Sequence, residues 1–146
     1  MLAPSKINFP YKEFKVRPFP NSSREISLFR PIIPVTIIKY SKLVRFEALI
    51  DSGADFNIFH GDVAAYLGLK LTAGSRRNIA GISRGKIKGY EHRVKLLVNS
   101  FSYQTKITFS NELPSNAIAV LGNSGFFDKF RVLLDLKNRT IDLRPQ

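Results

Sequence analysis

Ala48-Leu49-Ile50-Asp51-Ser52-Gly53-Ala54-Asp55 places an acidic residue directly after an apolar strand and before a turn of small residues. Small residues let two backbones approach closely, and Gly53 relaxes the dihedral limits of the turn. Taken alone, Asp-Ser-Gly is also typical of an ordinary Asx turn. The residues on either side must therefore decide between a simple turn and a functional carboxylate.

Short strands are predicted before this stretch and a short helix after it. Residues 32–38 and 44–50 are rich in β-branched and alternating apolar residues, and Ser41-Lys42 suits a hairpin turn between them. After the acidic turn, residues 62–67 fit a short helix that Gly68 ends.

The second half of the chain continues the pattern of short strands. It predicts a long hairpin at 78–98, a strand at 101–109 and a buried strand closed by glycine at 118–121. A short helix at 126–130 and a terminal hairpin at 132–143 follow. An apolar strand, a glycine turn and a helix occur at residues 48–67 and again, faintly, at 117–130, but only the first copy has an acidic residue in its turn. Many short strands with two short helices indicate an all-β domain of barrel or sandwich type.

Residues 1–30 differ from the rest because they are rich in proline and aromatic residues. Proline opposes a regular helix, and aromatic residues are uncommon in disordered tails. We expect an extended N-terminal arm docked on the body, with a removable pro-segment as the alternative. Residues 31–146 are expected to form one domain.

Composition excludes several classes of site. The 146 residues are 44% apolar, which suits one globular domain, and contain no cysteine, which excludes disulfides, thiol nucleophiles and thiolate metal sites. The two histidines, His60 and His92, lack the HExxH spacing of zinc hydrolases. No metal and no cofactor are expected.

The net charge of +12 raises the question of nucleic-acid binding. The charge is spread along the chain without a recognised nucleic-acid motif, so we expect a basic surface and no nucleic-acid partner. Its densest cluster, residues 76–95, holds seven Lys or Arg against the single Glu91, and Arg76-Arg77 is interpreted as a solvated pair.

The N-terminus lacks the apolar core of a signal peptide, and the most apolar run, residues 31–38, is too short to span a bilayer. We therefore expect a soluble, cytoplasmic protein that does not insert into a membrane.

These features together resemble the retropepsin-like aspartic proteases. Their signature of apolar residues followed by Asp-Thr/Ser-Gly-Ala is matched by Leu49-Ile50-Asp51-Ser52-Gly53-Ala54. The resemblance covers roughly residues 32 to 145, and includes a glycine-containing flap hairpin at 79–90 and the apolar-apolar-Gly element Val120-Leu121-Gly122. It implies an all-β, retropepsin-like acid-protease barrel with a flap hairpin and one or two short helices.

The resemblance also implies roles for the residues of the acidic turn. Asp51 matches the single catalytic carboxylate, and Ser52 matches the residue that hydrogen-bonds across a two-fold axis. Gly53 contributes backbone groups near the substrate, and Ala54 completes the supporting loop. Asp55 matches an acidic residue that holds the substrate backbone, with a capping or surface role as the alternative.

Further substrate contacts are expected at the flap tip, from Gly81, Ile82, Ser83 and Arg84, although Arg84 is larger than the glycine often found there. Leu121 and Gly122 match a structural element of the family.

Because Asp-Ser-Gly occurs once, the resemblance implies a homodimer that cleaves a peptide or protein substrate with one Asp51 from each chain. The terminal strand 140–143 is the candidate interface strand, and the alternative is that it completes the monomer's own sheet. Two other functions stay open, namely a catalytically silent dimerisation or peptide-binding domain and a basic nucleic-acid-binding β domain.

Overall fold

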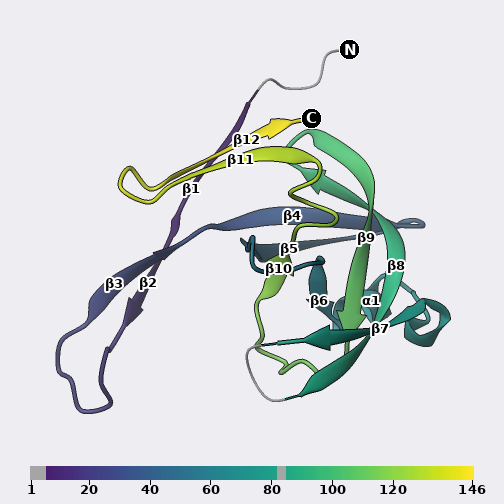
Figure 1. The fold of residues 1–146 in the computed structure, drawn as a ribbon, viewed down its shortest axis with the longest axis horizontal. Coiled ribbons are helices and arrows are strands. Elements are labelled where there is room, and N and C mark those ends of the chain that lie inside the picture. The colour runs from purple at the N-terminus through teal and green to yellow at the C-terminus, as the bar shows by residue number, and fades with distance from the viewer. Residues whose placement is uncertain (1–5, 82–84) are drawn as a thin grey trace.

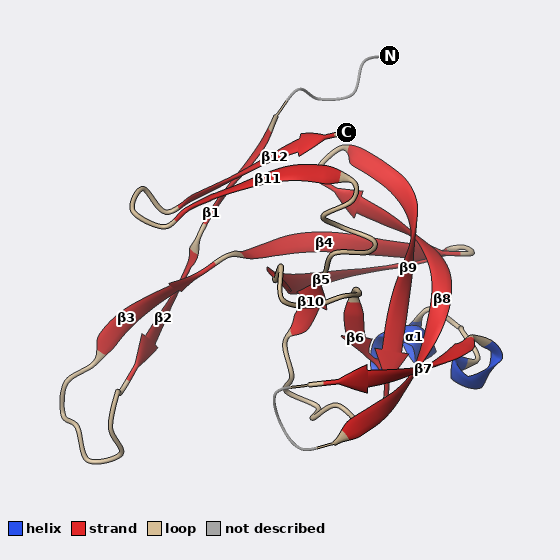
Figure 2. Ribbon diagram, in the orientation of Figure 1, coloured by secondary structure: helices blue, strands red, loops and turns tan. Residues whose placement is uncertain are grey.

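The computed structural model describes residues 6–81 and 85–146, and it is built almost entirely of strands (Figures 1 and 2). In chain order the elements are β1 Ile7–Pro10, β2 Lys12–Val16, β3 Ile26–Arg30, β4 Ile32–Lys39, β5 Lys42–Ile50, β6 Ile58–His60, α1 Gly61–Tyr66, the 3-10 helix η1 Leu71–Ala73, β7 Ser75–Ala80, β8 Lys86–Val98, β9 Phe101–Ser110, β10 Ala119–Leu121, β11 Phe130–Asp135 and β12 Thr140–Pro145.

Seven of these strands form the main sheet, in the order β4-β5-β10-β6-β9-β8-β7. The sheet curls until β4 also pairs with β8, with Thr36 opposite Leu97 and Ile38 opposite Lys95. This closure makes a barrel and leaves β7 as an extension beyond the closed ring. The prediction of an all-β barrel is confirmed.

The barrel interior is filled by side chains that alternate along the strands, as expected for strands with one buried face. In β4, Ile33, Val35 and Ile37 are buried. Phe59 from β6 and Phe109 from β9 are also fully buried, and their ring centroids lie 6.5 Å apart. All of these side chains belong to one core cluster, which also includes Ala48 and Ile50 of the strand that leads to the acidic turn.

The local turn and helix predictions hold to within one residue. The β4–β5 turn lies at Tyr40-Ser41, one residue earlier than expected. Helix α1 has six residues, and the His60 Nδ1 atom accepts a hydrogen bond from the Asp62 N–H at 3.0 Å, so His60 caps it. Gly68 follows the helix with φ of 78°, a left-handed conformation that favours glycine.

No helix within residues 6–81 and 85–146 has the length and apolar character needed to cross a membrane.

The helix predicted at residues 126–130 is wrong, because residues 126–129 form turns and Phe130 begins β11. The hydroxyl groups of Tyr103 and Thr105 both donate to the Gly125 carbonyl, each at 3.0 Å. Phe126 and Phe130 are buried, with centroids 5.0 Å apart, and Phe130 also contacts Tyr103 at 5.6 Å. Aromatic packing and these hydrogen bonds, made with a distant strand, override the local helical preference.

The terminal hairpin forms as predicted, but its last strand does not offer an edge to a second chain. β12 is the middle strand of a three-stranded sheet and pairs with both β1 and β11. The prediction that residues 140–143 pair with a partner subunit is therefore wrong, and the alternative holds: the strand completes the monomer's own sheet. As expected from alternation, Ile141 and Leu143 are fully buried.

Replacing Ile141 by alanine tests how firmly this small sheet is held to the body. Ile141 is fully buried, so we expect Ile141→Ala to lower the free energy of unfolding by about 2–5 kcal/mol. Leu43, which is 59% exposed, provides the control, and Leu43→Ala should cost less than about 1 kcal/mol. Urea unfolding monitored by circular dichroism measures both, and equal losses would contradict the packing described.

Candidate active site

Strand β5 delivers Asp51 to the end of the barrel. Ala48 and Ile50 are buried, which anchors the strand up to the residue before the turn. The Asp51 N–H donates to the Leu121 carbonyl at 3.0 Å, and the Gly53 N–H donates to Asp51 Oδ1 at 2.9 Å. The backbone therefore fixes both the position of Asp51 and the orientation of its half-buried carboxylate.

Strand β10 separates the two strands that flank this turn. It runs parallel to β5, with Val120 opposite Leu49, and antiparallel to β6, with Val120 opposite Ile58. The chain therefore leaves β5, loops past the end of β10 and returns on its other side. The strands that begin the two copies of the faint sequence repeat lie side by side in register, with residues 48–50 opposite 119–121.

Gly122 sits where this loop passes closest to β10. A Cβ atom at this position would lie 2.4 Å from the Phe56 carbonyl oxygen and 2.7 Å from that of Ala54, distances that no side chain tolerates. The Gly122 N–H donates to Asn57 Oδ1 at 3.0 Å, and Asn57 is fully buried. Absence of a side chain at residue 122 is what allows the acidic loop to close over the end of β10.

Asn123 and Ser124, for which no role in the site was predicted, hold the rest of the loop. The Asn123 side chain donates to the Ser52 carbonyl at 3.1 Å, while its N–H donates to the Ala54 carbonyl at 2.8 Å. The Ser124 N–H donates to the Asp55 carbonyl at 2.8 Å. The glycine turn of the second repeat was the signal that could have identified them.

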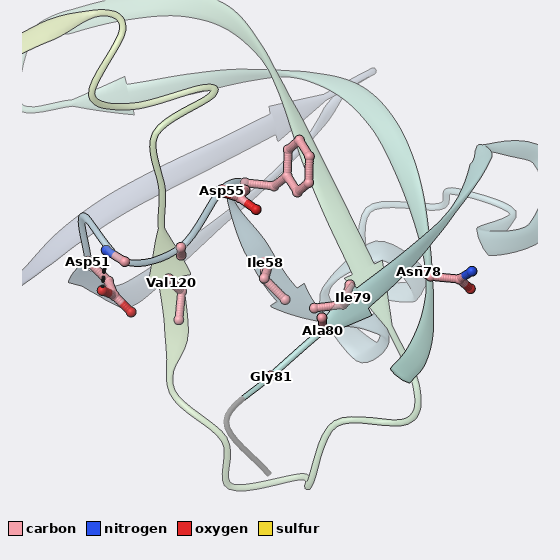
Figure 3. Close-up of a pocket in the computed structure, with 11 residues that line it drawn as sticks. Asp51, Asp55, Ile58, Asn78, Ile79, Ala80, Gly81 and Val120 are labelled. Atoms are coloured by element: carbon pink, nitrogen blue, oxygen red, sulfur yellow. Dashed lines mark hydrogen bonds between the residues drawn. The ribbon is translucent and has the colours of Figure 1, made fainter. Parts of the chain in front are cut away.

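A cavity of about 780 Å³ opens in front of the loop, as Figure 3 shows. Its wall is mostly apolar and comes from the acidic loop, β6, β7 and β10; the lining residues are Asp51, Gly53, Ala54, Asp55, Phe56, Ile58, Asn78, Ile79, Ala80, Gly81 and Val120. Asp51 and Asp55 are the carboxylates among them. The structure thus brings Asp51, Gly53, Ala54, Asp55 and Gly81 to one cavity, while Leu121 and Gly122 support it from behind.

The predicted flap is the hairpin of β7 and β8, paired from Ser75 opposite Glu91 to Ala80 opposite Lys86. Ile79, Ala80 and Gly81 reach the cavity from this hairpin. Three predicted flap-tip residues, Ile82, Ser83 and Arg84, lie outside the described residues. Ser52 is exposed, and its expected hydrogen bond to a second chain stays a prediction.

Arg77 ties the predicted flap to the acidic loop. Its guanidinium carbon lies 3.8 Å from the centroid of the Phe56 ring, and its Nη2 atom is bound to the Glu91 carboxylate. Lys106 Nζ lies 3.4 Å from the same carboxylate. The prediction of a solvated Arg76-Arg77 pair is therefore wrong for Arg77, because only Arg76 is exposed.

Competing effects act on the Glu91 carboxyl. Partial burial alone would raise its pKa, but hydrogen bonds and charge attraction from Arg77 and then Lys106 outweigh burial, so the pKa lies below its ordinary value of 4.5. Glu91 is therefore ionised at neutral pH and compensates the cation that covers Phe56.

The site offers carboxylates and backbone groups for chemistry. Among the described residues, no group of three or more His, Cys, Asp or Glu side chains is arranged to hold a metal ion. A carboxylate next to a cavity that can admit water and substrate can serve as a general acid or base.

No family model and no curated protein sequence matches the chain. Among solved structures, it is similar to a retropepsin-like aspartic protease from Rickettsia conorii, with a TM-score of 0.60 and 17% identity over 99% of this chain and 97% of that one. It is also similar to the retroviral protease-like domain of Ddi1 from Leishmania major, with a TM-score of 0.51 and 17% identity over 80% of this chain and 94% of that one. The chain therefore has the retropepsin-like fold.

Gly122 gives a direct test of the close approach behind the loop. Gly122→Ala would place a methyl group against backbone oxygens that side-chain movement cannot relieve, so we expect a loss of about 3 kcal/mol or more in unfolding free energy. In Gly68→Ala the new methyl group meets nothing within 4 Å, and only the positive φ should cost about 1–2 kcal/mol. Denaturant unfolding compares the two, and equal costs would contradict the crossing.

Glu91→Gln tests the link between flap and loop through pH. The folded-state pKa is lowered, so ionised Glu91 stabilises the fold above its unfolded pKa of about 4.5, and this contribution is lost as pH falls through the folded value. We expect Glu91→Gln to cost about 1 kcal/mol at pH 7, a modest value because solvent partly screens the pair.

The difference between wild type and Glu91→Gln should shrink toward zero below pH 4.5 in thermal or urea unfolding. Glu25→Gln, at an exposed position, is the control. A deficit independent of pH would show that Glu91 acts through packing and not through its charge.

Proposed function

We propose that the chain is an aspartic endopeptidase that hydrolyses peptide bonds at a site shared by two copies. The observation that carries this proposal is the Asp51 carboxylate, held by the backbone at the edge of a cavity of about 780 Å³ that the flap hairpin also lines. Its support is the retropepsin-like fold together with the Leu49–Ala54 signature.

Such a mechanism needs two carboxylates, and the chain supplies one in an Asp-Ser-Gly turn. The equivalent turn after β10 begins Gly122-Asn123-Ser124 and has no acid at the corresponding place. A homodimer supplies the second carboxylate, because two-fold symmetry places Asp51 opposite its own copy. Ser52, exposed beside Asp51, is then available to hydrogen-bond across the axis and brace the paired loops.

The paired carboxylates divide the work of acid and base. Two carboxylates so close cannot both ionise readily, so the pair shares one proton; aspartic proteases are the established example of this effect. The ionised Asp51 takes a proton from a bound water as its oxygen attacks the peptide carbonyl carbon. The protonated Asp51 donates to the carbonyl oxygen, and a neutral tetrahedral intermediate forms without a metal or covalent adduct. The Asp51 that took the water proton then gives it to the peptide nitrogen while the other Asp51 takes a proton from a hydroxyl of the intermediate, so that the C–N bond breaks, the amine and the carboxylic acid leave, and the pair again shares one proton.

The cavity suits an extended peptide. The backbone of the flap hairpin can pair with the peptide main chain, which is recognition by strand addition. Ile58, Ile79 and Val120 offer apolar walls to substrate side chains, and Gly53 and Asp55 offer backbone and carboxylate oxygens to the peptide N–H groups. We therefore expect apolar residues next to the cleaved bond.

Two other functions remain as rivals. A catalytically silent peptide-binding or dimerisation domain would share this fold and the dimer, but would not cleave. A nucleic-acid-binding domain would use the +12 charge and lose affinity steeply as salt is raised. Peptide cleavage by the wild type, together with its loss on changing Asp51, separates the proposal from both.

Asp51→Asn keeps the size of the side chain and removes its acid-base function. We expect it to lower peptide cleavage by a factor of about 10³ or more, while the dimer and the unfolding transition are retained. Asp62→Asn, at an exposed helix position, is the control and should keep full activity. Cleavage by a clean Asp51→Asn preparation would overturn the mechanism.

A mixing experiment tests whether the two carboxylates come from different chains. Adding roughly a ninefold excess of Asp51→Asn chains should leave about one tenth of the wild-type chains in wild-type dimers, with activity falling in proportion. Light scattering on the same samples reports the dimer. Undiminished activity in the mixture, or full activity from a monomer, would place both carboxylates in one chain.

A further inference from the structure

The N-terminal hairpin of β2 and β3, here called the arm (residues 12–30), stands apart from the barrel as a separate two-stranded sheet. Figure 1 shows it projecting from one end of the molecule, beyond the sheets that form the body. An isolated two-stranded hairpin is marginally stable in water unless one face packs against something. We therefore expect one face of the arm to pack against another surface.

The arm has one apolar face. Side chains directly opposite each other in an antiparallel ladder share a face, and Phe14 pairs with Leu28 while Val16 pairs with Ile26. None of these four side chains belongs to the core cluster formed by the described residues, and Ile26 and Leu28 are 39% and 37% exposed. Lys12 and Arg30 form the next pair on this face, and their cations lie 5.8 and 5.0 Å from the Phe14 ring centroid. The chain's own core does not fill this face, and two cations flank it at its base.

On the opposite face of the arm, the side chains already have partners within this chain. Ser27 Oγ donates to Glu13 at 2.6 Å, Lys15 Nζ lies 3.4 Å from the same carboxylate, and the Arg139 guanidinium covers the Phe29 ring at 3.8 Å. The Arg139 contact joins the arm to the β11–β12 turn on this side, whereas both Glu13 contacts lie within the arm. At the base of the other, apolar side, Lys12 is bound to the Glu47 carboxylate of β5.

The arm leaves the body beside the acidic turn that carries Asp51. The Ile50 N–H donates to the Pro31 carbonyl at 2.9 Å, and Ile32 lies opposite Leu49. Strand β3 therefore precedes β4 at the end of the sheet where β5 gives way to Asp51. Its five residues can reach about 17 Å from the Pro31 junction at an ordinary strand rise.

This direction identifies the occupant, on the basis of the proposed function. If two Asp51 carboxylates meet at a two-fold axis, the second copy must lie against the end of the barrel that carries Asp51, which is the end from which the arm projects. Two chains of charge +12 repel each other, so apolar contacts must drive the association. Six of the ten large apolar side chains that are exposed in the described chain lie on the arm or on the neighbouring β11–β12 hairpin: Phe19, Ile26, Leu28, Leu133, Leu134 and Leu136.

We infer that the apolar face of the arm packs on a second copy of this chain, so that two arms clasp the dimer reciprocally. Symmetry makes the contact occur twice, and each arm then buries the face formed by Phe14, Val16, Ile26 and Leu28. The contact replaces strand pairing through β12, whose two edges are occupied within the monomer.

The double variant Ile26→Thr with Leu28→Thr tests the arm. Threonine keeps strand propensity and removes most of the apolar surface. We expect the dimer dissociation constant from analytical ultracentrifugation to rise at least about tenfold. The matched control, Lys15→Thr with Ser27→Thr on the polar face, should change it by less than about twofold, and both variants should keep the melting temperature of the monomeric body.

A second measurement does not depend on weakening the arm. Because the chain has no cysteine, Leu28→Cys carrying a photocrosslinker should give covalent dimers on irradiation, whereas Ser27→Cys on the opposite face should give few. Equal crosslinking from both positions would overturn the inferred contact.

The outcomes separate this inference from the proposed function. If the wild type dimerises and the threonine double variant has the same dissociation constant, the arm contact is overturned. Mixing with Asp51→Asn then still tests the shared site. A higher KM for peptide with an unchanged dimer would assign the apolar face to substrate and also overturn the contact. An active wild-type monomer would overturn both.

Discussion

The carbonyl oxygens of Ala54 and Phe56 occupy the space that a side chain at residue 122 would need, and this crossing organises the site around it. It allows β10 to lie between β5 and β6, and it places the Leu121 carbonyl within reach of the Asp51 N–H. Both edges of β10 are then occupied, so the acidic loop cannot slide along it. Backbone packing therefore sets the position of Asp51. A network of flexible side chains could not define that position as tightly.

Local sequence patterns predicted many of the strands and turns. They did not predict the contacts between residues that are far apart in the chain. Alternating residues and turn residues predicted the hairpins after residue 31, and the apolar run into Asp51 predicted the loop. They did not predict the β2–β3 hairpin, because residues 1–30 were expected to form an extended arm. Phe126 and Phe130 are four residues apart, as on a helix face, yet hydrogen bonds from Tyr103 and Thr105 to Gly125 hold that segment in turns. Those bonds join residues at least 20 positions apart, and no local pattern reports them.

Arg77 shows a different reason for a missed contact. Two adjacent arginines suggest solvent exposure, but in the β7–β8 ladder Arg77 lies opposite Gly89, which makes Glu91 its diagonal neighbour. That neighbour could be predicted only with the hairpin register, which depends on the length of the turn. Because Glu91 also attracts Lys106, one carboxylate is shared by two cations, and the side of the flap over Phe56 keeps a net positive charge.

The pairing of β12 with both β1 and β11 constrains how two chains can assemble. A strand with both edges occupied has no N–H and C=O groups left for a third neighbour, so interleaving at this strand would require β1 or β11 to leave. Contacts between side chains are the remaining source of affinity, and they must overcome repulsion between two basic chains. Assembly driven in this way weakens on cooling and strengthens with salt, because salt screens the charge while hydrophobic burial fades at low temperature. A site divided between two such chains would inherit both dependences, since only the dimer holds two Asp51 carboxylates.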